Sequence, residues 1–536
     1  MAQPPLRCEE GNFQTPMPNI TEVPVLIVGG GAAGCVLSME LARRGVEHRC
    51  IERTPGPGRE SRAIAMHART IELFDLVDKE LSKLVLERDL WCKGYVMHFL
   101  RDGERTEVRP GLDYTTVDSR YNCILAHNQS ETETFVRDYT RSRFGKTIEY
   151  DTAFQDLTLE ADGVTARLTH ADRGDEEEFV RCRYLIAADG INSRVRRGLG
   201  MSVKGKDYAG SFFQNLDIHL NGFPDWTDYF HYCVGTDHFL MVAPLPGGHF
   251  RLLLSDRGEA ADPGITPQQA FMRLLERHFD GITMGDVVWH SRWETWVRLA
   301  DTFRQGNVFL AGDAAHVHST TGGQGMNCCM QDAFNLGWKL ALVLKGYAGG
   351  ELLNTYESER RPVAEQVIWA ASSLHDIFMT HGKDIAQRTR TMFEPGYTEK
   401  VVNTCSGVAY TYRDYVQKSA ALKEINGPDI GDRAPDIDFE QGGTLFDRLR
   451  HEYFTLLAMP GDGNRSKVIE RLQRRFSPVL AVETLPRSKA LSKRYGPSDG
   501  RLFLVRPDGY IAFKCSADEA HLLEAALEGV LTVRQH

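Results

Sequence analysis

The sequence predicts an α/β protein of several domains: a Rossmann-like dinucleotide-binding domain, an inserted antiparallel β-sheet domain and a further unit at the C-terminus. Three observations support this fold class. A short apolar run near the start ends in glycines and is followed by a stretch with helical spacing and a second apolar run. Segments of alternating polar and apolar residues indicate antiparallel strands near the middle of the chain. The total of 536 residues exceeds the size at which a single core stops growing.

The first unit follows a strand–turn–helix–strand order. Residues 23–28 read as a buried strand, and residues 32–44 have the apolar spacing of a helix that stops at Gly45. Residues 48–51 form the next strand, which leads into Glu52. This order is typical of the start of a parallel sheet. Further buried strands are predicted at 184–187 and 308–311, and helices at 69–88 and about 331–345.

The later segments complete the domain plan. Alternation around 213–220 and 229–254 predicts the β-layer, a helix is expected at 267–279, and helical stretches continue to about residue 395. A strand, hairpin and helix pattern after residue 500 predicts the C-terminal unit. The expected divisions are an N-terminal extension (1–22), the dinucleotide-binding domain in two parts (23–195 and 291–395), the β-layer (196–290), a connecting segment (396–426) and the C-terminal unit (427–536).

Composition excludes several classes of function. The net charge of −10 argues against broad affinity for nucleic acid, which needs clustered lysine and arginine. No apolar run approaches the ~20 residues of a membrane span. The first 22 residues are polar and proline-rich, unlike a signal peptide. Eleven scattered cysteines without a C-x-x-C motif fit reduced thiols, so a cytoplasmic protein is expected.

The glycine turn after the first strand is the first chemical motif. Gly29, Gly31 and Gly34 match G-x-G-x-x-G between a strand and a helix. Gly29 permits the tight turn, Gly31 lets the backbone approach a pyrophosphate, and Gly34 allows close packing of helix and strand. Glu52, at the end of the next strand, can accept hydrogen bonds from ribose hydroxyls. Ala33 and Arg53, adjacent to these positions, are included in the predicted dinucleotide-binding set.

Two later segments identify the kind of dinucleotide. They read YLIAADGINSRVR at 184–196 and GNVFLAGDAAHVHSTTGGQGMN at 306–327. Together they resemble the paired second and third fingerprints of the single-component, FAD-dependent aromatic hydroxylases, the class A flavoprotein monooxygenases. Within that family the chain is most similar to the pentachlorophenol 4-monooxygenase and phenol hydroxylase branch. The similarity runs from about residue 23 to the C-terminus and includes the stretches DYFHYCVGTDHF and SGVAYTYRD.

The resemblance implies FAD as cofactor and NAD(P)H as a transient co-substrate. It places Arg62 near the pyrophosphate, Gln129 beside the flavin, and Asp189 at the start of a segment that serves both flavin and nicotinamide. The residues themselves agree with this assignment. Asp313 directly follows a buried strand, where a carboxylate can hold a ribityl hydroxyl, and the glycine-rich loop after it leads into a helix whose N–H groups would face the reduced flavin. In the family, the residues that match Gly325, Met326 and Asn327 lie against the isoalloxazine ring.

One departure from the family pattern lies in this loop. The family usually has proline shortly after the GDAAH run, whereas this chain has Ser319-Thr320-Thr321. The loop borders the reacting face of the flavin, so its rigidity and polarity differ from the pattern.

Candidates for the substrate pocket lie on the predicted β-layer. Tyr232 and Arg251 have positions that could both turn inward, and they match the family's pocket wall; Tyr410 is a third candidate. The alternative is a sheet aromatic and a surface arginine. A metal site is not expected, because His316 and His318 have no evident third ligand.

The resemblance implies hydroxylation of a phenolic ring with NAD(P)H and O₂ through a flavin C4a-hydroperoxide, with displacement of a ring substituent as an option. A larger polyketide-type aromatic or a hydroxybenzoate is the alternative substrate. A flavin halogenase fits poorly, because the stretch from Trp293 to Trp296 does not match W-x-W-x-x-P. A non-catalytic redox sensor is the alternative from another class. The C-terminal unit resembles a thioredoxin-like domain without C-x-x-C, so packing or homodimer formation is its expected role.

Overall fold

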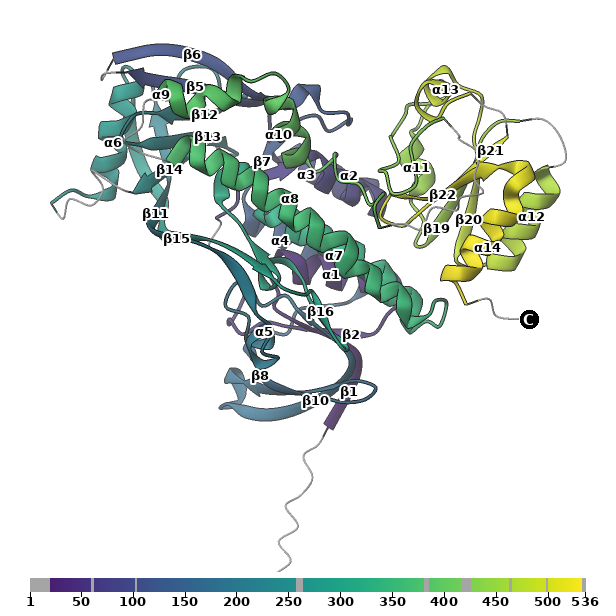
Figure 1. Ribbon diagram of the computed structural model, residues 1–536. Coiled ribbons are helices and arrows are strands. Elements are labelled where there is room, and N and C mark those ends of the chain that lie inside the picture. Colours follow the sequence, from purple (N-terminus) through teal and green to yellow (C-terminus); the bar gives the residue numbers. More distant parts are fainter. Residues whose placement is uncertain are drawn as a thin grey trace, which may run out of the picture.

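A computed structural model describes residues 20–532, with gaps at 59–61, 102–103, 257–263, 380–384, 416–425, 462–464 and 498–499. Three parts are visible in Figure 1: a central α/β body, an eight-stranded sheet at one end and a smaller α/β unit on the opposite side. Most of the expected N-terminal extension lies outside the described residues, and its last three residues belong to the first strand. Within the described ranges, no helix has the length and hydropathy needed to cross a membrane.

The central body is built on a parallel sheet. β1 (Ile20–Val28) lies between β2 (His48–Ile51) and β10 (Glu176–Ala187), and β10 also pairs with β17 (Val308–Leu310), all in parallel. The antiparallel strands that extend this sheet are β8 (Thr152–Leu159), β9 (Val164–His170) and β16 (Arg304–Gln305). The carboxyl ends of β1, β10 and β17 therefore meet at one edge, where the predicted glycine, Asp189 and Asp313 segments begin.

Helices cover this sheet. Every residue of α1 (Ala32–Ala42) is buried, because the helix contacts both α4 (Gln129–Phe144) and α7 (Gly325–Leu344). α7 begins at Gly325, six residues before the sequence pattern suggested, directly after Gly323 in the left-handed region and Gln324 at the N-cap. The short α5 (Arg194–Gly198) follows β10.

The predicted helix at 69–88 is divided in two. α2 (Ala68–Val77) ends at Asp78, whose side chain accepts a hydrogen bond from the Glu80 amide and caps α3 (Lys79–Arg88). A short side-chain acceptor competes with helix continuation, which explains the break. These helices lie next to a small antiparallel sheet of β3 (Ala65–His67), β7 (Ile124–Ala126) and β4 (Leu90–Cys92).

The eight-stranded sheet draws on more of the chain than the predicted β-layer. Its order is β18, β15, β11, β14, β13, β12, β5, β6, and only β12 and β5 pair in parallel. α6 (Pro267–His278) covers one face, and the other face joins the core of the body. Two of its strands, β5 and β6, come from before residue 196 and therefore lie outside the predicted β-layer. They complete the sheet edge beside β12. The bounds are Gly94–Arg101 (β5), Glu104–Asp113 (β6), Val203–Asn221 (β11), Phe230–Val234 (β12), Phe239–Leu245 (β13), His249–Asp256 (β14), Thr283–Ala300 (β15) and His316–Val317 (β18).

A long helix, α8 (Asn354–Met379), runs from the region of the C-terminal unit towards the eight-stranded sheet, as Figure 1 shows. The helical segments that follow it are α9 (Ile385–Thr389) and α10 (Tyr397–Ser406). α8 and α10 both lie over the loop between β18 and α7, so they form part of the roof of the central region.

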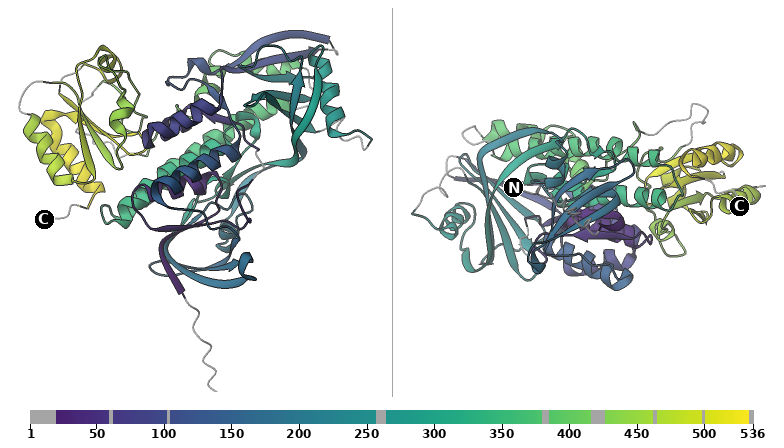
Figure 2. Two further views of the ribbon diagram at one scale, coloured as in Figure 1. Left: turned by 180° about the vertical axis from the view of Figure 1, so that it is seen from behind. Right: turned by 90° about the horizontal axis from the view of Figure 1, so that it is seen from below.

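The C-terminal unit has its own four-stranded sheet and lies to one side of the body (Figure 2). β19 pairs in parallel with β20 and antiparallel with β21, which pairs with β22. Ion pairs of Arg433 with Glu72 (2.8 Å) and Arg450 with Asp75 (2.7 Å) fix this unit against α2. Its elements are α11 (Leu445–Leu449), β19 (Phe454–Ala458), α12 (Arg465–Phe476), β20 (Leu480–Thr484), α13 (Lys489–Tyr495), β21 (Arg501–Val505), β22 (Ile511–Ser516) and α14 (Ala520–Val530).

Candidate active site

The glycine turn has the geometry that its sequence predicts. Gly29 has φ 108°, and its amide donates a 2.8 Å hydrogen bond to the Ile51 carbonyl. A Cβ at Gly29 would lie 2.3 Å from the Ala188 carbonyl oxygen, and one at Gly34 would lie 1.8 Å from the Gly29 carbonyl oxygen. Both positions therefore exclude any side chain. The turn brings β1, β2 and the segment after β10 into direct contact.

Glu52 closes the turn from the side of β2. Its Oε2 accepts a 2.9 Å hydrogen bond from the Gly30 amide, and its Oε1 accepts from the Thr54 amide at 3.1 Å. Arg53, next to it, is exposed, and Ala33 is buried in α1. Glu52 is thus held beside the turn in the position expected of a ribose-binding carboxylate.

The N-terminus of α1 is open to an acidic group. Gly31 is the N-cap, no side chain caps the helix, and the first turn contains no acidic residue. The helix therefore has no acidic group of its own at this end, and the carboxyl of Glu133 on α4 lies against the Ala32 amide. A Cβ at Gly31 would have only Glu133 Oε1 nearby, at 3.8 Å.

Glu133 is a site residue that sequence reasoning missed. It lies on α4, accepts a 2.9 Å hydrogen bond from Gln129 Nε2 and is 3.7 Å from Arg137. Burial raises the pKa of its carboxyl, while the bond from Gln129 and the charge of Arg137 act in the opposite direction. The i, i+4 spacing from Gln129 to Glu133 was the sequence feature that could have indicated their contact on a helix.

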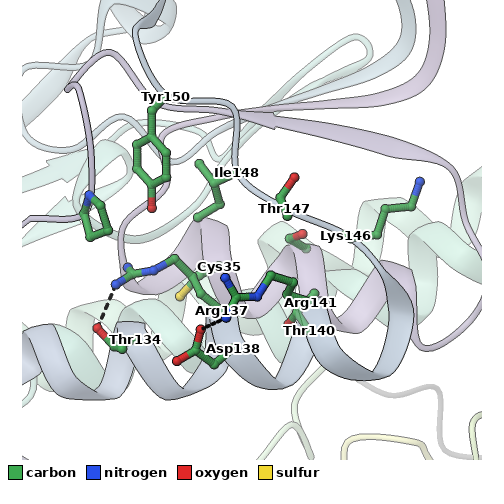
Figure 3. Close-up of a pocket in the computed structure, with 12 residues that line it drawn as sticks. Cys35, Thr134, Arg137, Asp138, Thr140, Arg141, Lys146, Thr147, Ile148 and Tyr150 are labelled. Atoms are coloured by element: carbon green, nitrogen blue, oxygen red, sulfur yellow. Dashed lines mark hydrogen bonds and ion pairs between the residues drawn. The ribbon is translucent and has the colours of Figure 1, made fainter.

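A cavity of about 210 Å³ lies beside the glycine turn. Figure 3 shows side chains of α1, α4 and the following segment around it, with Arg137 bonded to Thr134 and Arg141 bonded to Asp138. Ile148 joins the cavity to the turn, since a Cβ at Gly30 would lie 3.0 Å from its side chain. The lining residues are Cys35, Ser38, Pro57, Thr134, Arg137, Asp138, Thr140, Arg141, Lys146, Thr147, Ile148 and Tyr150.

Asp189 lies two residues after β10 and binds the first amides of α5, whose N-cap is Ser193. Its Oδ2 accepts hydrogen bonds from the amides of Arg194 (2.7 Å) and Val195 (3.3 Å). Its Oδ1 is buried and has no hydrogen-bond partner among the described residues. Burial raises the pKa of the carboxyl. A buried acceptor without a partner indicates that a donor outside the chain completes the site.

Asp313 follows β17, as the sequence predicted. Its side chain is exposed to solvent at the strand end, and Cys329 Sγ donates to Oδ1 at 3.4 Å. The surrounding protein desolvates the carboxyl and raises its pKa, while the nearby charges of His316 and Arg62 act in the opposite direction. Arg62 is itself exposed. One carboxylate oxygen of Asp313 therefore remains available to a ligand hydroxyl.

The start of α7 is fixed to the small sheet by Asn327. Its side-chain oxygen accepts from the His67 amide at 2.9 Å, and its amide donates to the carbonyls of Ala65 (2.8 Å) and Gly323 (2.9 Å). Met326 is buried beside it. The side chain of Asn327 is thus committed to the protein, and only the backbone of the Gly325 to Asn327 turn is available to a cofactor.

The loop without prolines is held by side chains instead. Ser319 is 2.9 Å from His375 Nδ1 of α8, and Thr321 donates a 2.7 Å hydrogen bond to the Ala371 carbonyl. These bonds tie the loop to α8. Buried polar atoms without a partner in the described chain also gather here, at His67, His318, Thr320 and Gln324.

Tyr232 faces this loop. Its hydroxyl donates a 3.2 Å hydrogen bond to the Thr321 carbonyl, and its ring packs against Tyr95, with centroids 4.4 Å apart, and Phe378. Burial raises its pKa well above the ordinary value, so the hydroxyl stays protonated at neutral pH. The single hydroxyl proton of Tyr232 is therefore held by the loop carbonyl and would have to turn to reach a ligand.

Arg251 shares the face of the sheet with Tyr232 but already has strong partners. It forms a two-point ion pair with Asp217 on the neighbouring strand and lies over the Trp289 ring at 4.8 Å. Its guanidinium also reaches the Arg62 carbonyl at 3.4 Å and Asn128 at 3.5 Å. It thus links the sheet to the central body, and Asp217 neutralises its charge.

Tyr410 lies apart from Tyr232 and Arg251. It belongs to a small cluster between α7, α8 and the C-terminal unit that includes Cys328, Val363 and Tyr510. Its hydroxyl is buried without a partner in the described residues. The structure therefore does not bring the third substrate candidate together with the other two.

His316 acquires partners that the sequence did not reveal. It lies 2.7 Å from Asp332 and 3.8 Å from Cys328, and the three ligand atoms would suit a metal by distance. Arg360 is 2.7 Å from Asp332 and 3.5 Å from Cys328, so a cation already occupies this environment. Burial opposes a charge on His316, but Cys328 and Asp332 hold its pKa well above the ordinary value. We therefore interpret His316, Asp332, Cys328 and Arg360 as a buried ion-pair network. A second group of three side chains whose possible metal-ligand atoms lie near one another consists of Asp89, His127 and Glu131.

Comparisons with known proteins cover nearly the whole chain. Residues 22–371 match the family described as FAD binding domain, and residues 427–532 match the family described as aromatic-ring hydroxylase, C-terminal. Pentachlorophenol 4-monooxygenase of Sphingobium chlorophenolicum is 34% identical over 95% of this chain and 96% of its own length. A 6-methylpretetramide 4-monooxygenase of Streptomyces rimosus is 30% identical over 94% and 93%. A solved ternary complex of aklavinone-11 hydroxylase with FAD and aklavinone is 27% identical, with a TM-score of 0.75 over 95% of this chain and 99% of that chain.

Proposed function

The chain belongs to the FAD-dependent aromatic-ring monooxygenases, and on that premise we propose that it hydroxylates a phenolic ring with NAD(P)H and O₂. The observation that carries this proposal is the position of Tyr232, a buried neutral donor beside the loop that leads into α7. A donor there would favour the phenolate form of a bound phenol, whose ring carbons are more electron-rich than those of the neutral phenol.

The residues of the site fit FAD. Gly29 and Gly34 form a turn without side chains, and α1 begins without a capping side chain of its own, which suits a pyrophosphate. Asp189 has a buried carboxylate oxygen with no hydrogen-bond partner among the described residues. We assign Glu52 to the adenosine ribose and the cavity of Figure 3 to the adjoining end of the cofactor. The remaining proposed contacts are Gly31, Ala33, Arg53, Arg62, Gln129, Asp313 and the backbone of Gly325, Met326 and Asn327.

The protein's own part in the reaction is to bind and orient the ring. When bound, FAD supplies the electrons taken from NAD(P)H and the activation of O₂. Tyr232 would turn its single hydroxyl proton from the Thr321 carbonyl to the substrate oxygen and hold the ring over the apolar residues of the sheet, while α8 and the Thr321 loop exclude water. Arg251 orders this wall through Asp217 and adds no free charge to the pocket. We therefore assign Tyr410 to packing rather than to the substrate.

Two substrate classes remain supported by relatives. The relative from Sphingobium is named for a chlorinated phenol, and the Streptomyces relative and the solved complex are named for polycyclic aromatics. A halogen or nitro group on the attacked carbon would leave in the first class.

The direct test uses the purified holoenzyme with a panel of single-ring phenols, halophenols and polycyclic phenols. NADH and NADPH consumption is measured with each compound, and products are identified by mass. Stimulated consumption with a product that has gained one oxygen atom is expected. Consumption that no aromatic compound stimulates would contradict the proposal and favour a redox sensor.

Replacement of Asp313 with alanine is expected to lower the FAD content of the purified protein. The variant loses a charge-assisted hydrogen bond to the cofactor, worth about 1.5–3 kcal/mol of binding free energy. The ratio of flavin to protein absorbance measures the effect, and Asp162→Ala, an exposed carboxylate on the β8–β9 turn, is the control. Equal flavin content in both variants would remove Asp313 from the cofactor site.

Replacement of Tyr232 with phenylalanine is expected to uncouple the enzyme. NAD(P)H oxidation continues, but product yield falls about 10- to 100-fold and peroxide release rises, because the phenolate loses a donor. The same loss raises the pKa of the bound phenol, so the optimum of the rate profile moves to higher pH. Tyr229→Phe, outside the sheet interior, is the matched control. Wild-type coupling at every pH would exclude Tyr232 from the substrate contact.

A further inference from the structure

Asn215 of β11 is a fully buried amide with no hydrogen-bond partner. Its exposed fraction is 0%, and neither its oxygen nor its nitrogen is bonded to any described residue. On the adjacent strand, Ser291 pairs directly with Asn215, and its hydroxyl oxygen is also buried and unbonded within the described chain. Burying such groups without partners is unfavourable, so a pair of them on one wall indicates a ligand that completes their hydrogen bonds.

The two residues face the candidate active site. Leu216, the next residue, packs under α6 on the outer face, so Asn215 points to the inner face. Two positions before it, Phe213 contacts His375 of α8, with ring centroids 6.2 Å apart. Two positions after it, Asp217 binds Arg251, which reaches the central body. Asn215 therefore lies between two points where the sheet meets the rest of the protein.

Asn215 also lies in one row with Tyr232. Strand pairing gives the order Ser291, Asn215, Leu253, Met241, Tyr232 across neighbouring strands. Directly paired residues share a face of the sheet. The row thus has a polar group at each end and two apolar side chains between them, which form a floor suited to aromatic rings.

The length of this row sets the size of what would bind it. Asn215 and Tyr232 are three strands apart, and strands are spaced by about 4.8 Å, so the two residues are about 14 Å apart across the sheet. A single-ring phenol cannot bond to both. Two fused rings with oxygens at opposite ends, with a hydrogen bond of about 2.8 Å at each end, have the required span.

We propose that Asn215, with Ser291, binds an oxygen substituent at the far end of a substrate of at least two rings, whose hydroxylated ring lies at Tyr232. This proposal rests on the proposed function and names the substrate class. The amide can donate to a carbonyl or accept from a hydroxyl, and Ser291 can do either. A ligand that lacks the far oxygen would leave both groups buried without partners.

The test compares 2,6-dihydroxynaphthalene with 2-naphthol on the holoenzyme, with dissociation constants measured by quenching of protein fluorescence. Wild-type protein is expected to bind the dihydroxy compound roughly 10- to 100-fold more tightly. In Asn215→Leu, which keeps the branched shape of the side chain and removes both polar atoms, this preference should fall to nearly one. Ser291→Ala should reduce it by a smaller factor, and Gln214→Leu, on the opposite face of β11, should retain it.

Three outcomes would overturn the proposal: no preference in the wild-type protein, no binding of the dihydroxy compound, or an unchanged preference in both the Asn215 and Ser291 variants. A folding defect in one variant leaves the other to decide. Failure of the proposed function is separate, because it would show as binding of the dihydroxy compound with no oxygenated product. Oxygenation of both compounds with the same preference in all variants would refute only the role of Asn215 and Ser291.

Discussion

Gly34→Ala is expected to yield a protein that retains essentially no FAD and expresses poorly. The new Cβ would lie 1.8 Å from the Gly29 carbonyl oxygen, a backbone atom that cannot move without displacing the turn. The turn also positions the start of α1, where the pyrophosphate would bind. Separation of α1 from β1 would disturb a helix whose every residue is buried. Flavin absorbance and the thermal unfolding midpoint measure the two effects.

Gly529→Ala is the matched control for this substitution. Gly529 lies in α14, and a Cβ there would meet no atom within 4 Å. Alanine in a helix is favoured over glycine by about 1 kcal/mol, so this variant should be as stable as the wild type or more stable. Full flavin content in Gly34→Ala would contradict the assigned role of the turn.

Glu359→Gln is expected to destabilise the protein by about 3–5 kcal/mol, because it removes one partner of a buried ion-pair network. Glu359 of α8 binds Arg506 of the C-terminal unit at two points, each 2.8 Å, and Lys339 of α7 at 2.8 Å. The substitution would leave two buried cations with one acceptor fewer. Denaturant unfolding at pH 7 measures the loss of free energy of unfolding.

The pH dependence of stability gives a second reading of the same network. Burial would raise the pKa of Glu359, but Arg506 and Lys339 outweigh it and lower the pKa to about 2 from an ordinary 4.5. As the pH falls, the carboxyl therefore binds a proton in the unfolded chain before it does so in the folded protein. The stabilisation is present above about pH 4.5 and is lost as the pH falls towards 2. In Glu359→Gln this contribution to the acid dependence should disappear. Glu524→Gln, which breaks a pair with the exposed Arg471 and Arg475, should cost less than about 1 kcal/mol and serves as control.

Local patterns predicted the parts of the site that local geometry determines. The glycine turn, Glu52 and Asp313 each follow a buried strand, and that position alone fixes where they lie in a parallel sheet. Alternation along the strands allowed Tyr232 and Arg251 to turn inward together, and the strand register puts them on one face of the sheet.

Those local patterns could not predict contacts between residues that are far apart in the sequence. The partner of Arg251 is Asp217, and the pair depends on the register of β11 against β14. Glu133 and Asn215 have ordinary sequence surroundings, and only their burial in the fold makes them notable. Tyr410 was a third candidate from the segment after the long helices, and the fold places it in a cluster with Tyr510 of the C-terminal unit.

The order of strands in the sheets constrains how the chain can acquire its cofactor during synthesis. β1 pairs with β10, and β10 pairs with β17, so the edge that carries the glycine turn, Asp189 and Asp313 is complete only after residue 313 has left the ribosome. The eight-stranded sheet is likewise complete only with β18. At a synthesis rate of about 5–20 residues per second, roughly 15–60 seconds pass before this edge can be complete. Flavin capture is therefore a late event in biogenesis, and the exposed strand edges before it make chaperone protection of the nascent chain important.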